Sequence, residues 1–499
     1  MKVLFLHLGR ESLGIEYLSS SLKAAGHETA LGLDPGLFGE NDNVFYVPKL
    51  ERFFDQSERL LRLSRRIKPD AVAFSAYTST YRWCLQMARD VKRDTQARVV
   101  MGGPHATLVP DAVAARPEVD FAVAGEGEEA MAELANALEA GRAAHGIANI
   151  ALKHNGRVRV NPVRPPIADL DALPLPDKAL FEKDINFEDD YLVLGSRGCV
   201  YHCTYCCESF LNDLYCRQFY RRRSVASVMD ELLLMKQRYR YKEVMFNDAV
   251  LCIDKQWLAD LMARFRAEIG VPFRCFGQAR HVNEETARLL KSGGCYAIEF
   301  GVQTVNEDIR RRILNRRETN ETNARAFAAC DAAGIAYDLD HMFGLPEETV
   351  ADHKAAATFY SGLKRLNRVK VHNLTCFPRT AMADIMREKD LLSDEDLHRM
   401  EAGETGDFFH VDEIRDPQAA QAKRAFANLF KLLPGLPGRW TRRFAAGEGW
   451  RWFGRMPKPL VICGQTLIAL RHLDYRFWLY IRYYMRRIQR WARTHASAK

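Results

Sequence analysis

Short apolar runs alternate with amphipathic segments over about the first 140 residues. The runs are Val3–Leu6, Ala71–Phe74, Val99–Met101 and Phe121–Ala124. After the first run, Gly14–Ala25 places Ile15, Leu18 and Leu22 on one helical face. Alternation of strand-length runs with helical patterns predicts a doubly wound, Rossmann-like parallel sheet in an α/β protein.

Small and polar residues follow three of these runs directly. They are Ser75, Ala76, Tyr77 and Thr78; Gly102, Gly103, Pro104 and His105; and Gly125, Glu126 and Gly127. In doubly wound sheets a ligand sits at the carboxyl ends of the strands, and glycine lets the backbone approach it closely. We therefore expect these three loops to form a binding edge.

The remaining pattern divides the chain further. Residues 145–190 are rich in proline and predict a linker that starts with a hairpin at Asn155-Gly156. Six more strand-length runs, separated by helical patterns, then predict a partial (β/α)6 barrel. They are Leu192–Gly195, Glu243–Phe246, Phe273–Phe276, Ala297–Phe300, Tyr337–Met342 and Lys370–Leu374. The predicted domains are thus 1–144, a linker 145–190, a barrel 191–385 and a helical region 386–499.

Cys199, Cys203 and Cys206 form the only close-spaced set among twelve cysteines. Three thiolates at intervals of four and three can hold three irons of a [4Fe–4S] cluster and leave the fourth iron open. A zinc site normally needs four ligands, typically two separated pairs, and the second pair is missing. Chance spacing is the other alternative, but the set follows the first predicted strand of the barrel, which favours the cluster.

Charge is distributed unevenly along the chain. The net charge is +8, yet residues 421–499 hold 17 Lys or Arg and only two acids, Glu448 and Asp474. The scattered cysteines fit a reducing compartment, and the chain start resembles a buried strand rather than a secretory signal. The longest nearly uncharged stretch, Leu460–Leu470, is too short to cross a bilayer. We expect a cytoplasmic protein.

The basic tail carries an apolar helical stripe. Its members are Leu470, Leu473, Phe477, Ile481, Tyr484, Ile488 and Trp491, beside several arginines. A basic, Trp-rich amphipathic stretch suits an anionic membrane surface, which would place the protein peripherally at the inner membrane and suggest a lipidic substrate. Packing of the stripe on the barrel is the equal alternative. Nucleic acid is not expected, because the chain lacks a recognisable RNA-binding module.

The stretch Gly198-Cys199-x3-Cys203-x2-Cys206, with Tyr205 before the third cysteine, resembles the radical S-adenosylmethionine (SAM) superfamily. The resemblance implies that SAM chelates the open iron and that one electron cleaves it to a 5′-deoxyadenosyl radical. It also implies a small-molecule substrate and an external electron donor of the flavodoxin or ferredoxin type. The protein's share is to position SAM and to exclude water.

Further segments match that superfamily in order, and the resemblance implies SAM contacts for Asn247 and Asp248, Arg280, Glu299 and Gln303, and Gly344. Arg280 offers a bidentate fork to the SAM carboxylate. Two positions depart from the usual pattern: Ala249 replaces a glycine or acid, and Glu347 replaces the glycine after Pro346. The backbone of the adenine-binding turn is therefore expected to differ.

The amino-terminal segment resembles the cobalamin-binding domain fused to many of these enzymes, and the resemblance covers roughly residues 1–385. Many such domains ligate cobalt through a histidine in D-x-H-x-x-G, a pattern that fails at His7. His105 could contact the corrin, but we expect cobalamin without a histidine below it, an arrangement that favours methyl transfer.

Three functions remain open from the sequence. The first is transfer of methyl from methylcobalamin to an unactivated carbon, or less often to phosphorus. The second is radical oxidation or ring formation without methyl transfer, as in the anaerobic cyclase of chlorophyll synthesis, which this architecture also resembles. The third is a non-enzymatic cobalamin sensor or carrier, which would form no 5′-deoxyadenosine.

Overall fold

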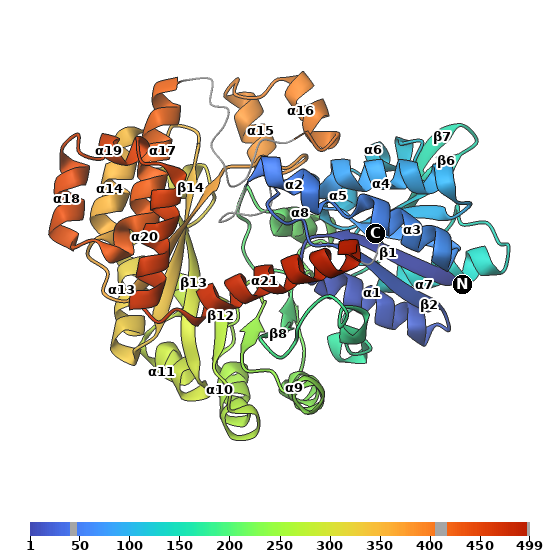
Figure 1. The fold of residues 1–499 in the computed structure, drawn as a ribbon, viewed down its shortest axis with the longest axis horizontal. Coiled ribbons are helices and arrows are strands. Elements are labelled where there is room, and N and C mark those ends of the chain that lie inside the picture. The colour runs from blue at the N-terminus through green and yellow to red at the C-terminus, as the bar shows by residue number, and fades with distance from the viewer. Residues whose placement is uncertain (40–46, 405–416, 497–499) are drawn as a thin grey trace.

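The structure is a computed structural model that describes residues 1–39, 47–404 and 417–496. Two sheets lie side by side, the amino-terminal one at the right of Figure 1 and the second at its left. In spatial order the first sheet consists of β2 (Glu28–Asp34), β1 (Lys2–Leu8), β3 (Ala71–Ser75), β4 (Arg98–Gly102), β5 (Phe121–Val123), β6 (Ile150–His154) and β7 (Arg157–Val160).

The first sheet is covered by helices on both faces, as the alternation of apolar runs predicts. Along β1, Val3 and Phe5 pack toward α1 (Leu13–Ala24) and α7 (Glu128–Glu139), whereas Leu4 and Leu6 pack toward α3 (Ser57–Ile67) and α4 (Tyr81–Asp94). Successive strand residues point to opposite faces, so a strand buried on both faces is apolar throughout. The fold class predicted for this segment is confirmed.

The hairpin predicted at Asn155-Gly156 belongs to the first sheet and not to a linker. Its strands β6 and β7 extend the first sheet, because β6 pairs antiparallel with β5 through Phe121 and Leu152. The sheet is therefore mixed rather than wholly parallel. The segment from Asn161 onward runs to the second sheet through short turns, η2 (Leu170–Ala172) and η3 (Lys178–Leu180).

The second sheet is an open, wholly parallel barrel segment of six strands. In spatial order these are β15 (Leu366–Asn373), β14 (Ala336–Phe343), β13 (Cys295–Gln303), β12 (Phe273–Gly277), β11 (Val244–Phe246) and β8 (Tyr191–Val193). The helices α9 (Val225–Tyr239), α10 (Lys255–Arg264), α11 (Glu284–Gly293), α13 (Asn320–Ala333) and α14 (Val350–Tyr360) pack on its outer face. The predicted partial barrel is confirmed.

Shorter elements and the carboxy-terminal helices complete the fold. The shorter ones are α2 (Pro48–Phe54), α5 (Pro104–Leu108), α6 (Pro110–Ala115), β9 (Ser196–Arg197), α8 (Cys207–Leu214), β10 (Arg221–Arg222) and α12 (Glu307–Arg312). The carboxy-terminal ones are α15 (Ala381–Glu388), α16 (Asp394–Glu401), α17 (Pro417–Leu432), α18 (Gly438–Ala446), α19 (Arg451–Gly454), α20 (Lys458–Arg471) and α21 (Tyr475–Ala496). None of the helices in the described ranges is long and apolar enough to cross a membrane.

The predicted apolar stripe of the tail is interrupted. Leu473 has a φ of 51° and is 85% exposed, so it separates α20 from α21 instead of continuing one helix. Leu470 is exposed as well, whereas the later part of the stripe packs on the protein. The ring of Trp491 lies 4.7 Å from that of Phe54, and the Tyr484 hydroxyl accepts a hydrogen bond from the Phe38 amide. Packing is thus the reading that the structure supports for α21.

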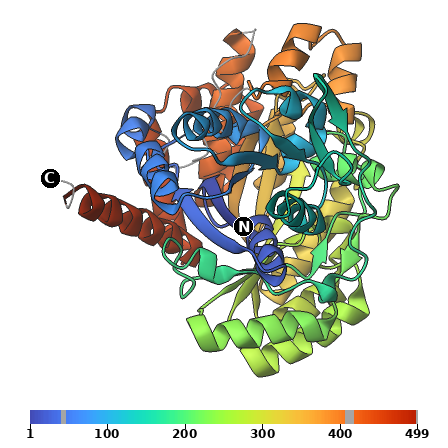
Figure 2. The ribbon, with the colours of Figure 1, turned by 90° about the vertical axis from the view of Figure 1, so that its right-hand side faces the viewer.

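Helix α21 is fastened at both ends by ion pairs. At its start, buried Arg476 donates to Asp338 of β14 at 2.7 Å. Further along, Arg482 pairs with Asp189 and Arg487 with Asp184, both in the segment between the two sheets. Figures 1 and 2 show α21 leaving the barrel and running beside the first domain, so the helix connects both halves of the molecule.

Candidate active site

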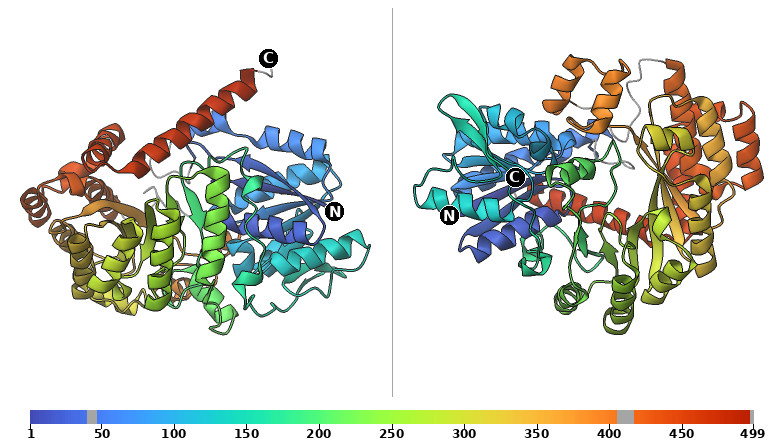
Figure 3. Two further views of the ribbon diagram at one scale, coloured as in Figure 1. Left: turned by 90° about the horizontal axis from the view of Figure 1, so that it is seen from below. Right: turned by 180° about the vertical axis from the view of Figure 1, so that it is seen from behind.

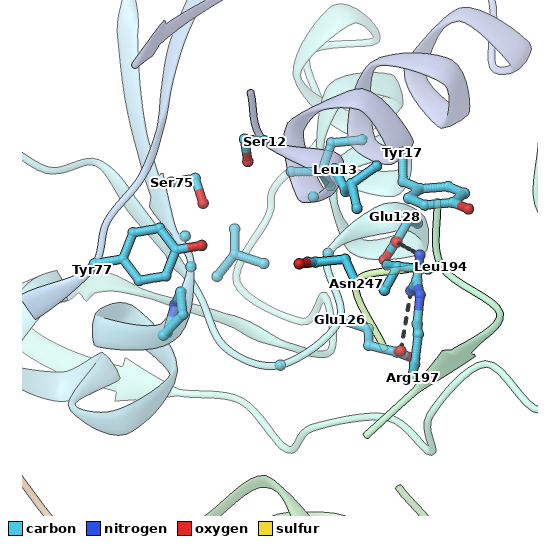
Figure 4. A pocket seen from close by; sticks show the side chains of 18 of the residues that line it. Ser12, Leu13, Tyr17, Ser75, Tyr77, Glu126, Glu128, Leu194, Arg197 and Asn247 are labelled. Carbon is cyan, nitrogen blue, oxygen red and sulfur yellow. Dashed lines mark hydrogen bonds and ion pairs between the residues drawn. The ribbon is translucent and has the colours of Figure 1, made fainter. Parts of the chain in front are cut away.

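A cavity of about 680 Å³ lies between the two sheets. Of the residues predicted to bind cofactors, it is lined by Ser75, Tyr77, Gly102, Gly103, Pro104, Gly125, Glu126, Gly127 and Asn247. Figure 4 shows that Ser75, Tyr77 and Asn247 come from different elements and surround one space. The carboxyl-terminal edges of both sheets therefore border the same cavity, and a ligand on the first domain would face the barrel.

Gly103 shows why this edge needs glycine. Its φ is 92°, and a Cβ there would lie 2.7 Å from the amide nitrogen of Ala76. A side chain would thus clash with backbone, which cannot move aside as a flexible side chain can. The Ala76 amide in turn donates to the Gly102 carbonyl, so two predicted loops are joined.

Three residues of the predicted edge lie outside the cavity lining: Ala76, Thr78 and His105. His105 is fully buried, its Nδ1 lies 3.1 Å from the Thr78 hydroxyl, and its Nε2 lies 3.1 Å from the Glu401 carbonyl. Burial lowers its pKa to about 4, which keeps the ring neutral. Both ring nitrogens are occupied within the protein, and we place His105 as a support for the Tyr77–Thr78 loop.

Glu126 joins the two domains rather than standing open in the cavity. Its carboxylate accepts hydrogen bonds from Arg221 at 2.8 Å and from Arg197 at 3.2 Å, while Arg197 also pairs with Glu128 (Figure 4). Burial alone would raise the pKa of Glu126, but the hydrogen bond from Arg221 and the charge of Arg197 lower it. The carboxylate therefore stays charged and links the first-domain loop to β9 and β10.

The cysteine loop follows β9 directly. Gly198 turns the chain with a φ of 81°, and a Cβ at this position would lie 2.5 Å from the Phe219 carbonyl. The loop backbone is fixed by two side chains of α8: Asn212 donates to the Cys199 carbonyl at 2.5 Å and Ser209 to the Cys203 carbonyl at 2.7 Å. These two contacts hold the backbone of the cysteine loop against α8.

The three predicted cluster cysteines lie close enough to influence one another. Burial, with a smaller contribution from the charges of Cys203 and Cys206, raises the pKa of Cys199 to about 12. A hydrogen bond shared with Cys207, followed by burial, raises the pKa of Cys206. Thiols in such surroundings become thiolates when a cation offsets their charge, as iron does. The donor set fits a [4Fe–4S] cluster.

Arg316 is a site residue that the sequence analysis missed. From the loop after α12, its guanidinium donates to the Tyr205 hydroxyl at 3.2 Å and lies 3.9 Å from the Cys203 sulfur. It also pairs with buried Glu318 at 2.5 Å. In the sequence Arg316 stands in a run of basic residues without a distinguishing pattern, so only the fold identifies it.

The remaining residues predicted to bind SAM differ in whether a ligand in the cavity could reach them. Asn247 faces the cavity, whereas the buried Asp248 carboxylate accepts from the Gly195 amide and the Ser196 hydroxyl, and so holds the turn after β8. Arg280 is exposed, with its guanidinium 5.9 Å from the centre of the Tyr201 ring. Asn247 is the member of this group that a ligand in the cavity could reach directly.

On the later strands, Glu299 forms an ion pair with Lys370, and its burial raises its pKa. Gln303 is buried at the end of β13 with its Oε1 lacking a hydrogen-bond partner in the described structure, so it keeps an acceptor for a ligand. The Gly344 amide donates to Glu348 at 2.9 Å, which shapes the turn after β14.

Glu208 is a second residue that the sequence analysis missed. It lines the cavity one residue beyond Cys207, and its Oε2 has no hydrogen-bond partner in the described structure. Burial raises its pKa to about 7, against a smaller opposing effect of Arg221. A carboxyl with this pKa can give or take a proton near neutrality.

We expect Glu208→Gln to leave stability unchanged near pH 4 and to raise it increasingly as pH rises toward 7. The unfolded carboxyl ionises from about pH 4.5, but the buried one stays protonated to about 7. The unmodified protein therefore loses stability as pH rises through this window, because its unfolded state releases the proton first. Above the window, the difference in stability between the variant and the unmodified protein is constant. Melting temperature against pH checks this; a constant difference at all pH values would contradict it.

Comparisons with known proteins agree with this arrangement. The B12 binding domain family matches residues 10–135, and the radical SAM superfamily matches residues 193–360. An uncharacterised methyltransferase of Pyrococcus horikoshii is 29% identical over 60% of this chain and 66% of its own. The anaerobic magnesium-protoporphyrin IX monomethyl ester cyclase of Rubrivivax gelatinosus is 26% identical over 70% of this chain and 63% of its own. The chain thus spans just under two thirds of these relatives.

Among solved structures, the radical SAM methyltransferase TsrM of Kitasatospora setae, with cobalamin and a [4Fe–4S] cluster bound, aligns with a TM-score of 0.62 at 18% identity. The alignment covers 78% of this chain and 75% of the other. At this identity the likeness concerns the fold alone.

Proposed function

Because this chain belongs to the cobalamin-dependent radical SAM enzymes, with a [4Fe–4S] cluster, SAM and cobalamin as cofactors, we propose that it transfers a methyl group from cobalamin to an unactivated carbon. The observation that carries the proposal is the single cavity bordered by both sheets. A methyl group on a ligand of the first domain would face the space in which a substrate radical forms. When bound, the cofactors supply the radical and the methyl group.

The chain's own residues position these groups and keep water away. We assign the first-domain loops Ser75–Tyr77, Gly102–Pro104 and Gly125–Gly127 to cobalamin, and Cys199, Cys203 and Cys206 to the cluster. Asn247 and Gln303 contact SAM, and Arg316 fixes the cluster loop through Tyr205. Leu13, Leu194 and Phe276 line the cavity with apolar surface, which limits the approach of water to a reactive intermediate.

Methyl-deuterated SAM tests the reaction directly. Anoxically reconstituted enzyme is incubated with small-molecule and lipid extracts, and products are followed by mass spectrometry. A product that gains one labelled methyl group supports methyl transfer. A product that loses hydrogens or gains oxygen without label overturns it in favour of radical oxidation or cyclisation, the function of the cyclase relative.

For the partner of the carboxy-terminal region we propose an anionic membrane surface, contacted through α18, α19, α20 and the start of α21. Exposed large apolar side chains gather there: Trp440, Trp452, Leu460, Leu467, Leu470, Leu473, Trp478 and Met485. Exposed basic residues accompany them: Arg439, Arg442, Arg443, Arg451, Arg455, Lys458 and Arg471. Figures 1 and 3 place these helices beside the barrel, remote from the first domain.

Each basic residue near an anionic surface contributes about 1 kcal/mol, and exposed Trp side chains favour the interfacial layer. We expect the enzyme to sediment with phosphatidylglycerol-containing vesicles and less with pure phosphatidylcholine, and salt to release it. Trp440→Ala with Trp452→Ala should weaken binding at least tenfold. The matched control is Val158→Ala with Val160→Ala, exposed positions on β7 of the first domain. Equal binding to both vesicle types would refute an anionic site.

A further inference from the structure

A buried cluster of two histidines and one glutamate lies outside the active-site cavity. His341 is on β14, Glu348 ends the turn after that strand, and His353 is on α14. One ring nitrogen of each histidine and one carboxylate oxygen of Glu348 all lie within 4.8 Å of one another, and Glu348 Oε1 lies 3.8 Å from His353 Nδ1. Three elements of the barrel thus bring three metal-ligating side chains to one point between the sheet and its outer helices.

Three atoms of the cluster have no hydrogen-bond partner in the described structure: His341 Nε2, Glu348 Oε1 and His353 Nδ1. The exposed fraction is 1% for His341 and 7% for His353, and 4% for the Glu348 side chain. A buried polar atom without a partner costs about 1–3 kcal/mol, and buried polar groups are normally paired. Three such atoms that converge indicate a missing ligand rather than three independent defects.

The other polar atoms of His341 and Glu348 hold these two side chains in position. His341 Nδ1 lies 3.0 Å from the Tyr360 hydroxyl, and Glu348 Oε2 accepts from the Gly344 amide at 2.9 Å. Metal-binding histidines commonly use their second nitrogen in this way, which fixes the ring orientation. These contacts leave His341 Nε2 and Glu348 Oε1 available to a ligand.

We propose that His341, Glu348 and His353 bind a divalent transition metal ion of the zinc class. Two imidazoles and one carboxylate suit such an ion, whereas calcium and magnesium prefer oxygen ligands alone. Zinc bonds of about 2.0–2.2 Å require the ligating atoms to approach by roughly 1 Å. Two charged groups act on both Glu348 and His353: the carboxylate of Asp352 on α14 and, after it, the ammonium of Lys423 on α17.

The three side chains would supply three ligands of a tetrahedral zinc ion, and water would supply the fourth. The ion would hold the local fold together. It would join β14, the turn Gly344-Leu345-Pro346 and α14, and so fix a turn that borders the assigned SAM site. The inference does not depend on the reaction that the enzyme catalyses. Because the ligands include no cysteine, the site is chemically distinct from the cysteine loop.

Zinc content of the full-length chain tests the site. The background carries Cys199→Ala, Cys203→Ala and Cys206→Ala, so that zinc cannot occupy the cluster loop. After incubation with zinc chloride and gel filtration, elemental analysis should give one zinc per chain. Glu348→Gln and His353→Gln should each reduce zinc retention at least tenfold. The control Glu347→Gln changes the adjacent exposed carboxylate, which pairs with Arg312 and Lys389, and should retain the metal.

Zinc should also raise the melting temperature of the background protein but not of the Glu348→Gln variant. If the variants fail to fold, X-ray absorption of the zinc-loaded background still decides: a shell of nitrogen and oxygen with imidazole scattering supports the site, and sulfur ligands overturn it. Retention of less than about one tenth of a zinc per chain by the background, or equal retention by Glu348→Gln and the background, would also overturn it.

Discussion

Replacing Cys199, Cys203 and Cys206 together by Ala should abolish reductant-dependent formation of 5′-deoxyadenosine while cobalamin remains bound. We assign the three thiols as the donors that hold the cluster, and without the cluster SAM would have neither an iron to chelate nor an electron source. The cobalamin loops come from the first sheet, whose fold does not use these cysteines. Chromatography of the nucleoside and the absorbance of bound cobalamin measure both outcomes.

The control replaces Cys216 and Cys463, both exposed and outside the close-spaced set of cysteines, by Ala. This variant should cleave SAM at the rate of the unmodified enzyme. Continued cleavage by the triple Ala variant would show that the cluster is bound elsewhere, and loss of cobalamin from it would show that the two cofactor sites are not independent.

The second large effect is expected at Arg316. Arg316→Met should lower the rate of SAM cleavage at least 100-fold, because it removes the guanidinium beside Tyr205 and the Cys203 sulfur. Removing one partner of a buried ion pair also costs about 3–5 kcal/mol of folding free energy, here by leaving Glu318 unpaired. Arg316→Met with Glu318→Gln removes that stability cost and should still fail to cleave SAM efficiently.

Arg317→Met is the matched control, because this neighbouring arginine is exposed. It should keep both rate and melting temperature. The effect at Arg316 is measured as 5′-deoxyadenosine formation at saturating and limiting SAM, together with the electron paramagnetic resonance signal of the reduced cluster. A normal cleavage rate in the stable double variant would assign Arg316 a purely structural role.

The strands of both sheets could be predicted because their cores are continuous apolar runs. β1 and β3 are buried on both faces, so the pattern is visible without knowledge of their neighbours. The hairpin β6–β7 was visible through Asn155-Gly156, but its pairing with β5 was not, because pairing joins residues about 30 positions apart. The apolar tail stripe likewise gave no sign of the break at Leu473 or of the ion pairs formed by α21.

The sequence alone predicted the cluster cysteines, the order of the two sheets and the glycine loops, because each depends on residues adjacent in the chain. Tertiary structure decided which predicted residues share one cavity and which are engaged elsewhere, as Glu126 is with Arg221 and His105 with Glu401. It also revealed Arg316, Glu208 and the cluster of His341, Glu348 and His353. Their environments arise from burial and from contacts between distant segments, which local sequence patterns do not encode.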